Sequence, residues 1–497
     1  MVKFELNIAI AGIDTKQVLI DLWRISRERL RAGAGFAVAS VIAALLSFWT
    51  IAYFARHQAL VVQLCISGVI VALSIVRSDE RAAGPGGRGR MPQWLTWVAR
   101  FALIPLVALL VSALGHVVRS DAALGFALIG VPLVAAIWVR RFGPVWTRLG
   151  SLWSFPFVAS LVTPVPALVA GAGVWWAALA ALIAVGWGSI LGWLASGARS
   201  GDPVGRRAPD AERAALASAQ NPAGAAARAP RKLAASTRMA LHLAVSLAAA
   251  ILLGSWLLPD HLGWFVLTAY IVNSGNRGRG DVVYKGIQRL IGAGVGTVVA
   301  TLLGALYAPG DSTAIVALFV ILGIGAVLRT VSYAWWAAAM TGGLSLLYDF
   351  LGQGGTDVLG QRLLAILLGG LIAIVASVFI APVRSIDVVR RRTGDLLGLG
   401  REVLTGDRSA PSYPALAPEV REASARITQL APPFHALRIV TFGRVARARS
   451  TADLIDRAAA LGPGLEQFVA QPSRELGASL GGELRGLREL VVALRRD

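Results

Sequence analysis

Residues 264–304 read WFVLTAYIVNSGNRGRGDVVYKGIQRLIGAGVGTVVATLLG, and this stretch decides the fold. An apolar run ends at Asn273, a loop rich in glycine and arginine follows, and a second apolar run starts at Ile287. Such runs are typical of membrane-spanning helices, but the first, residues 262–272, is shorter than the roughly 20 residues that a full span needs. Two interpretations stay open: a broken helix that lines a polar cavity, or a helix whose polar end continues into the cytoplasmic headgroup layer.

The whole chain has the composition of a membrane protein. Of its 497 residues 56% are hydrophobic and 15% are charged, and the mean hydropathy is +0.65. Strand-like alternation of apolar and polar residues is absent, which argues against a β-barrel. The net charge of +20 lies in loops between apolar runs, where orientation in a membrane explains it better than phosphate binding does. We therefore expect membrane lipid, and no nucleic acid, as a partner.

The apolar runs predict an all-α integral membrane protein with about twelve transmembrane helices in two parallel six-helix repeats, plus a C-terminal cytoplasmic helical region. The predicted spans of the first half are 32–53, 59–76, 95–115, 122–139, 152–169 and 174–195. Those of the second half are 239–258, 262–272, 287–307, 313–328, 331–348 and 363–381.

Basic residues predict the orientation of these spans. The loops that would lie outside carry only Arg56, Arg119 and Arg362, whereas the segments between them are rich in lysine and arginine. Because positive loops are retained on the cytoplasmic side, both termini are predicted to be cytoplasmic and the protein to lie in the inner cell membrane.

Landmark residues recur in the same order in the two halves, which predicts an internal repeat. An even number of spans in each half gives the two copies the same membrane orientation. The matched landmarks are Arg31 and Trp49 with Arg238 and Trp256, Arg100 and Gly115 with Arg289 and Gly304, and Asp121 and Arg140 with Asp311 and Arg329.

The chain divides into five predicted regions. The tail, residues 383–497, has helix-period apolar residues among arginines and is predicted to form about four amphipathic helices, broken near 411–418 and 432–433. It would pack against the inner membrane face or against a partner subunit in a homodimer. The other regions are an N-terminal interfacial helix (1–31), the first membrane repeat (32–195), a cytoplasmic linker (196–236) and the second membrane repeat (237–382).

Motifs for catalysis, metals and cofactors are absent from the sequence. There is no Walker loop, the five histidines are dispersed, and the single cysteine, Cys65, excludes a disulfide within one chain. The sequence predicts no enzyme, no cofactor and no metal site. Gly292 and Gly296 lie inside an apolar run, where such spacing favours close helix packing over nucleotide binding.

A known family resembles the second half from about residue 238 to 382. The short eighth span that starts near Trp264, the glycine-rich basic loop and the motif Gln288-Arg289-Leu-Ile-Gly292-x-x-x-Gly296 look like the signature of the fusaric acid resistance-like (FUSC) transporter family, which includes aromatic acid exporters. This resemblance implies export of small organic anions or hydrophobic acids, driven by the proton gradient.

Candidate residues for a substrate or ion pathway follow from the need to compensate a carboxylate inside a bilayer. Arg100, Lys285 and Arg289 lie at inner span ends, while Asp349 and Arg362 flank one outer loop and are expected to pair. For each arginine the alternative is an anchor that reaches the headgroups. Asp349 is the candidate for a proton-linked carboxylate, with a structural salt bridge as its alternative. Asn273 and Asn276 complete the set as the polar end of the eighth span.

Three functions stay open. The leading hypothesis is a secondary transporter that exports small aromatic or other organic acids, with a periplasmic adaptor as a further expected partner. The alternatives are an anion channel and a non-transporting envelope scaffold whose basic tail recruits other proteins.

Overall fold

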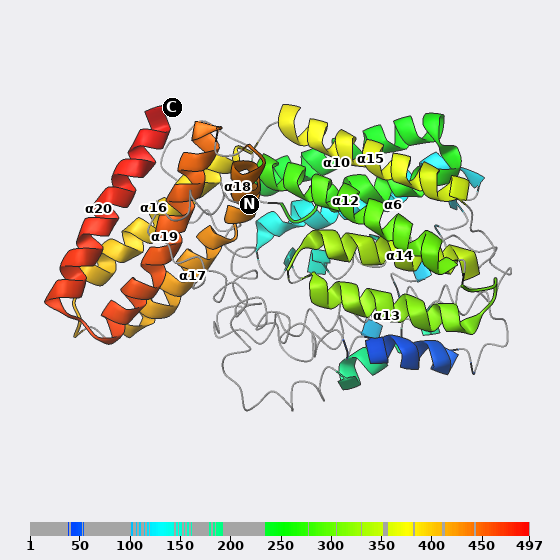
Figure 1. Ribbon diagram of the computed structural model, residues 1–497, viewed down its shortest axis with the longest axis horizontal. Helices are drawn as coiled ribbons and strands as arrows, with labels where there is room; N and C mark the ends of the chain where they lie inside the picture. Colours follow the sequence, from blue (N-terminus) through cyan, green and yellow to red (C-terminus); the bar gives the residue numbers. More distant parts are fainter. Residues whose placement is uncertain are drawn as a thin grey trace, which may run out of the picture.

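In the computed structural model the second half of the chain is a set of packed helices (Figure 1). The structure describes residues 234–496, apart from 277, 305, 330, 351–355, 381–382, 410–412 and 442–443, together with stretches of the first half of which 121–143 is the longest. Every regular element in the described part is a helix. The prediction of an all-helical protein is therefore confirmed for this part of the chain.

Seven helices of 12 or more residues make up most of the apolar part of the described structure. Four segments are long and apolar enough to cross a membrane: Ala122–Phe142, Ala235–Leu257, Arg279–Gly304 and Leu359–Phe379. The chain is thus a multi-pass membrane protein. The helices are α6 (Ala122–Trp138), α10 (Ala235–Leu257), α11 (Leu262–Asn273), α12 (Arg279–Gly304), α13 (Ser312–Leu328), α14 (Tyr333–Phe350) and α15 (Thr356–Phe379).

These helices agree with the predicted spans to within a few residues at most ends. The largest difference is at α12, which begins at Arg279, about two turns before the predicted span at 287–307. Its first turns are polar, so the hydropathy pattern did not mark them. α10 begins at Ala235, inside the predicted linker. The twelve-span plan as a whole involves first-half residues that lie largely outside the described part.

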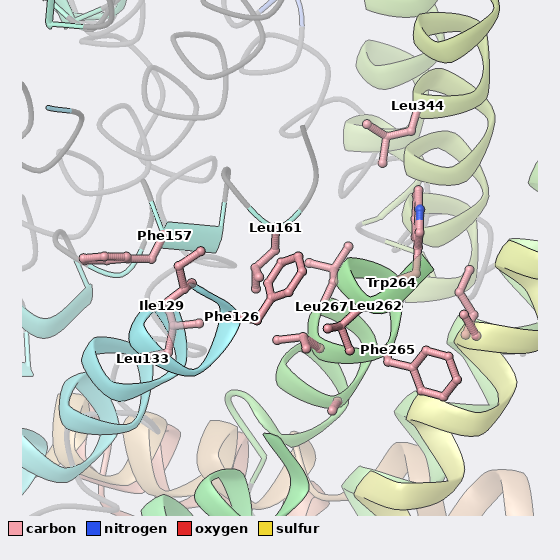
Figure 2. Close-up of a cluster of buried hydrophobic side chains, with 14 of the residues drawn as sticks. Phe126, Ile129, Leu133, Phe157, Leu161, Leu262, Trp264, Phe265, Leu267 and Leu344 are labelled. Atoms are coloured by element: carbon pink, nitrogen blue, oxygen red, sulfur yellow. The ribbon is translucent and has the colours of Figure 1, made fainter. Parts of the chain in front are cut away.

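The core of the apolar part forms where α6, α10, α11 and α15 meet. Figure 2 shows Phe126, Ile129 and Leu133 on α6 directed towards side chains of the neighbouring elements, while Leu262 and Phe265 project from α11. Both faces of α11 are apolar and most of its residues are buried. A helix that is apolar all round belongs at the centre of a bundle. α11 is therefore the central element of the described membrane part.

The eighth span ends where its sequence turns polar. α11 has 12 residues, which is about 18 Å of helix against a hydrocarbon layer of roughly 30 Å. The chain leaves it through Gly275, whose φ of +72° is in the left-handed region that favours glycine. α12 then starts at Arg279. The helix therefore ends at Asn273, one residue beyond the predicted span, and the choice between a broken helix and a polar end in the headgroup layer stays a prediction.

α12 and α14 run in the same direction and approach closely along a row of glycines. A Cβ on Gly292 would meet Ala334 O and lie 2.6 Å from Ala337 Cβ. A Cβ on Gly296 would meet Ala338 O and lie 2.9 Å from Thr341 Cβ. Small residues at this spacing allow two helix backbones to touch.

The tail forms a second helical body with its own core. Its helices are α16 (Ser385–Thr405), α17 (Leu416–Thr428), α18 (Ala431–Val440), α19 (Ala446–Ala470) and α20 (Arg474–Arg496). Five helices are therefore present where about four were predicted, although both predicted breaks occur: α17 begins at Leu416 and α18 has prolines in its first turn. Buried leucines, valines and isoleucines of α16, α17, α19 and α20 form the core.

The tail is joined to the membrane part at the start of α12. The backbone N–H of Gly280 donates to Ser385 Oγ at 2.9 Å, and the N–H of Arg279 donates to Val383 O at 3.1 Å. A Cβ on Gly278 would lie 2.7 Å from Ser385 Oγ. The segment that leads into α16 therefore satisfies N–H groups that the first turn of a helix leaves without partners.

Candidate functional site

Two arginines are buried in the membrane part, near opposite ends of α14. Arg289 on α12 is 2% exposed and Arg362 on α15 is 4% exposed. The Nε atoms of both are buried and make no hydrogen bond in the described structure, and neither guanidinium forms an ion pair with a described carboxylate. A buried cation without a carboxylate is costly, so both positions call for an anion or an aromatic surface.

The inner cluster consists of Arg289, Lys285 and Tyr333. Arg289 interacts electrostatically with Tyr333, the first residue of α14. Lys285, one turn earlier on α12, donates from Nζ to Ser274 O at 2.7 Å and lies 5.6 Å from the centroid of the Tyr333 ring. Two cations from one face of α12 thus converge on a single aromatic ring.

The loop before α14 is tied to the same face of α12. Gln288 Nε2 donates to Ser332 Oγ at 3.0 Å, next to Tyr333. Ser332 Oγ in turn accepts from the N–H of Ala334 at 3.3 Å. These bonds fix the start of α14, and therefore the Tyr333 ring, against α12.

The two predicted asparagines hold the end of α11. Asn273 is buried, and its Nδ2 donates to Ser246 Oγ on α10 at 2.9 Å and to Ala269 O at 3.1 Å. Asn276 Nδ2 donates to Val272 O. Both donors of the Asn273 amide are therefore used within the protein, and the described contacts of both residues are structural ones.

The outer cluster is built around Arg362. Its guanidinium carbon lies 3.7 Å from the centroid of the Tyr348 ring and 5.5 Å from that of Trp264. Figure 2 shows Trp264 on α11, on the side that faces α14. A guanidinium in an aromatic environment keeps its charge and its donors while its faces are covered.

Asp349 lies near this cluster but does not form an ion pair with Arg362. A Cβ on Gly304 would lie 2.9 Å from Asp349 Oδ2, so the carboxylate rests against the end of α12. Asp349 and Arg362 interact electrostatically, but no N–O distance within 4.0 Å joins them. The expected ion pair is therefore absent, because the guanidinium packs on Tyr348 instead.

His261, in the turn between α10 and α11, is the third titratable group of the outer cluster. Its Nδ1 is buried without a hydrogen bond in the described structure. Burial, assisted by the charge of Arg362 and opposed by Asp260, lowers the pKa of His261. Both burial and the charge of Arg362 favour the neutral form of the imidazole.

Sequence reasoning found the charged members of both clusters and missed the aromatic ones. Tyr333, Tyr348 and Trp264 come near the arginines only through the packing of α11, α12, α14 and α15, and the sequence did not assign any of the three to the site. Arg100, the remaining predicted pathway residue, lies outside the described residues. Among the residues that the structure describes, no group of three His, Cys, Asp or Glu side chains gathers for a metal.

Comparison with known families gives a match for the second half of the chain. Residues 247–376 match the family described as fusaric acid resistance protein-like, a segment that runs from α10 into α15. No curated protein and no solved structure matches the chain. The resemblance to the fusaric acid resistance-like family is thus confirmed for the segment that carries both buried arginines.

Proposed function

We propose that this protein is a secondary transporter of the inner cell membrane that exports small aromatic or other organic acids in a proton-linked cycle. The observation that carries the proposal is the pair of buried arginines, Arg289 and Arg362, neither of which forms an ion pair within 4.0 Å with a carboxylate among the described residues. Both lie in the segment that matches the family.

The physical case rests on charge compensation. A carboxylate that leaves water for a bilayer loses several kcal/mol of hydration unless a cation and hydrogen-bond donors replace it. An arginine supplies both in a planar fork that fits a carboxylate. Tyr333 and Tyr348, which mark the inner and outer clusters, are roughly 22 Å apart along α14. Two cation sites at that separation suit an anion that enters near one face and leaves near the other.

Aromatic rings at both clusters support an organic rather than an inorganic anion. Tyr333 lies beside Lys285, and Tyr348 and Trp264 lie beside Arg362. Such rings offer apolar and π surface to the body of an acid while the arginine takes its carboxylate. Asp349 is the carboxyl group proposed to carry the proton, since it interacts with Arg362 and a change in its charge is felt there.

The proposed arrangement has twelve spans, both termini in the cytoplasm and two parallel halves. Support for the repeat comes from the helix that follows each matched aspartate. Asp121 caps α6 by accepting from Leu124 N at 3.0 Å, and Asp311 caps α13 by accepting from Thr313 N at 2.9 Å. A homodimer that packs through the tail and a periplasmic adaptor are proposed as partners.

The test is transport into everted membrane vesicles. Vesicles that contain the protein should accumulate a radiolabelled aromatic acid faster when their interior is acidified, and Arg289→Gln and Arg362→Gln should each abolish the difference. Arg401→Gln, an exposed arginine on α16, is the matched control and should transport normally. Equal uptake with and without the protein, over a panel of acids, would contradict the proposal.

A second measurement separates a carrier from an anion channel. In planar bilayers a channel gives unitary conductance steps that are indifferent to pH, whereas the proposed carrier gives none. Asp349→Asn should lose accumulation driven by the proton gradient and keep exchange of labelled for unlabelled acid. Loss of exchange as well, in protein that is correctly folded, would remove Asp349 from the proton step.

A further inference from the structure

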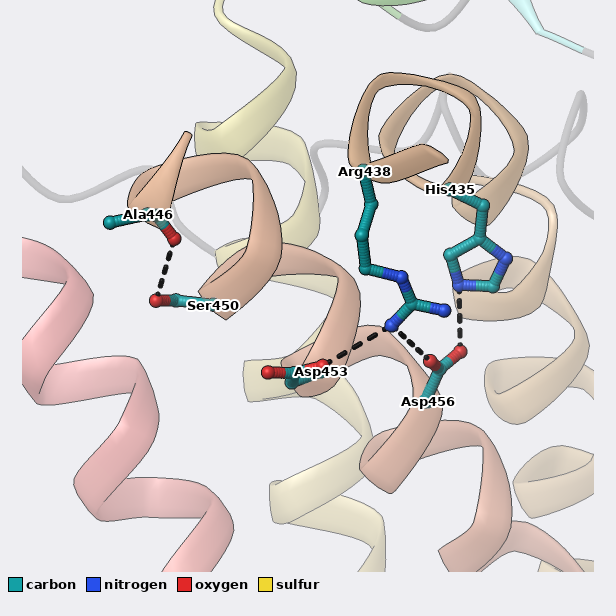
Figure 3. A network of polar contacts seen from close by, with 6 residues as sticks. All are labelled: His435, Arg438, Ala446, Ser450, Asp453 and Asp456. Carbon is teal, nitrogen blue, oxygen red and sulfur yellow. Dashed lines mark hydrogen bonds and ion pairs between the residues drawn. The ribbon is translucent and has the colours of Figure 1, made fainter. Parts of the chain in front are cut away.

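The polar side chains of α18, His435 and Arg438, contact aspartates of α19 within the tail. His435 Nε2 lies 2.8 Å from Asp456 Oδ1, and Arg438 Nη1 lies 3.3 Å from Asp453 Oδ1 and 3.4 Å from Asp456 Oδ2 (Figure 3). These contacts attach α18 to α19 along one side and fix how it is rotated. The opposite side of α18 must face away from α19.

The last turn of α18 and Val445, the residue before α19, carry exposed apolar side chains. Ile439 is 71% exposed and Val440 is 74% exposed, and Leu437 and Val445 next to them are exposed as well. These four side chains, the α18 patch, are contributed by a short stretch of chain rather than scattered over the tail. A contiguous exposed apolar patch marks a contact with another molecule or with a membrane.

The α18 patch lies close to the membrane part. α18 contacts α12, and Pro433 approaches Gly280 near the first turn of α12. Figure 1 shows α18 on the side of the tail that faces the apolar helices, at the end where α12 begins. Since α12 is long and apolar enough to span a membrane, α18 lies near the level at which the bilayer ends.

The residues around the patch are positively charged and therefore complementary to an anionic surface. Arg444, Arg447 and Arg449 follow α18 directly and are exposed. Residues 437–452 contain no acidic residue, and the two aspartates that come next are already in contact with Arg438. Apolar side chains flanked by arginines are the composition of segments that lie in the interface of anionic membranes.

We propose that the α18 patch, together with Arg444, Arg447 and Arg449, inserts into the anionic headgroup layer of the same membrane and holds the tail against it. The apolar members of the α18 patch enter the acyl boundary, and the three arginines contact lipid phosphates. A second copy of the chain is the weaker candidate for this surface, because four side chains fall far short of the roughly 20 to 30 residues a side of a specific protein interface. The inference depends on the membrane part alone and does not require transport.

The test uses the full-length protein in nanodiscs, with Cys65→Ser as background. An environment-sensitive dye is attached at Val440→Cys and, as a matched control, at Val492→Cys, which replaces an exposed valine on α20 of the same tail. In discs with phosphatidylglycerol the dye at position 440 should shift to the blue and be quenched by lipids that carry a nitroxide near the headgroup. The dye at position 492 should do neither.

The lipid charge and the arginines provide the second arm. Replacing phosphatidylglycerol by phosphatidylcholine, or changing Arg444, Arg447 and Arg449 to glutamine, should reduce the quenching at position 440. Equal behaviour of the two dyes would overturn the proposal. A blue shift at position 440 without quenching by lipid would also overturn it, since protein would then cover the patch. Equal quenching in both lipids would overturn the anionic part.

Discussion

At the residue scale, the Arg362 guanidinium depends on aromatic rings in place of a carboxylate. The contact with Tyr348 at 3.7 Å predicts that Tyr348→Leu destabilises the protein more than Tyr348→Phe, which keeps the ring face and loses only the hydrogen bond with Trp264. A desolvated cation–π contact contributes about 1–2 kcal/mol, and 1 kcal/mol corresponds to about 2–4 °C in Tm for a domain of this size. The apparent Tm of the purified protein in detergent measures this. A similar loss in both variants would mean that the hydroxyl, not the ring, holds the arginine.

A second residue-scale prediction concerns Asp311. Its carboxylate accepts from the N–H of Thr313, and hydrogen bonding to the charged form lowers the pKa of Asp311 below its usual 3.8. A lowered pKa means that the group stabilises the folded state above pH 3.8, and this contribution is lost as the pH falls through the folded-state value. Hydrogen exchange in the first turn of α13 should therefore accelerate in Asp311→Ala at pH 7 and differ little from wild type near pH 2.

The matched control for this prediction is Asp311→Asn. Asparagine is an equally good N-cap and does not titrate in this range. Protection in that variant should be close to wild type at pH 7 and independent of pH below it. A variant that loses protection with acid as the wild type does would show that another group is responsible.

The sequence predicted the charged residues of the candidate site because charge inside an apolar run is conspicuous. Arg289, Arg362 and Asp349 were all named in advance, but their partners were not. Tyr348 precedes Asp349 in the chain, and nothing local shows that its ring, and not the carboxylate, lies against Arg362. Which of two neighbouring side chains reaches a cation depends on how α14 is rotated about its axis, and packing decides that.

At the scale of elements, α12 and α14 depend on glycines at one face of α12. A Cβ on Gly296 would meet Ala338 O, so Gly296→Ala should push the helices apart and destabilise the protein by about 1–3 kcal/mol. Gly294 has nothing within 4 Å of an added Cβ. Gly294→Ala should therefore be neutral or stabilising by up to about 1 kcal/mol through helix propensity. The yield of monodisperse protein and the apparent Tm test both; equal effects of the two changes would argue against glycine-mediated packing.

Hydropathy predicted the helices of the membrane part well, since a span must be apolar wherever it meets lipid. It failed where a helix projects beyond the apolar layer, as α12 does at Arg279. In the tail, prolines predicted some helix boundaries correctly and others not. Those at 432–433 begin α18, whereas Pro463 lies inside α19 without ending it, and five helices formed instead of about four. α19 continues through Pro463 while it packs on α17 and α20.

At the scale of the whole molecule, the alternation of helices fixes on which side of the membrane each loop lies. If each helix crosses the membrane, the turn between α12 and α13 lies on one side, and the turn between α13 and α14 and the tail lie on the other. Basic loops are retained in the cytoplasm, so the turn at Ala308 is predicted to be outside and those at Val331 and the tail inside. All three positions described here are exposed: Ala308, Val331 and Val492.

Single cysteines in a Cys65→Ser background test this arrangement. A membrane-impermeant maleimide should label Ala308→Cys in intact spheroplasts, and it should label Val331→Cys and Val492→Cys only in everted vesicles or after permeabilisation. The comparison of positions 308 and 331 is the most discriminating, because a single helix, α13, separates them. If both were labelled from the same side, α13 would not cross the membrane. If all three positions were labelled from the side opposite to the one predicted, the helices would still cross the membrane but in the inverted orientation. Arg289 would then lie near the periplasm and Arg362 near the cytoplasm.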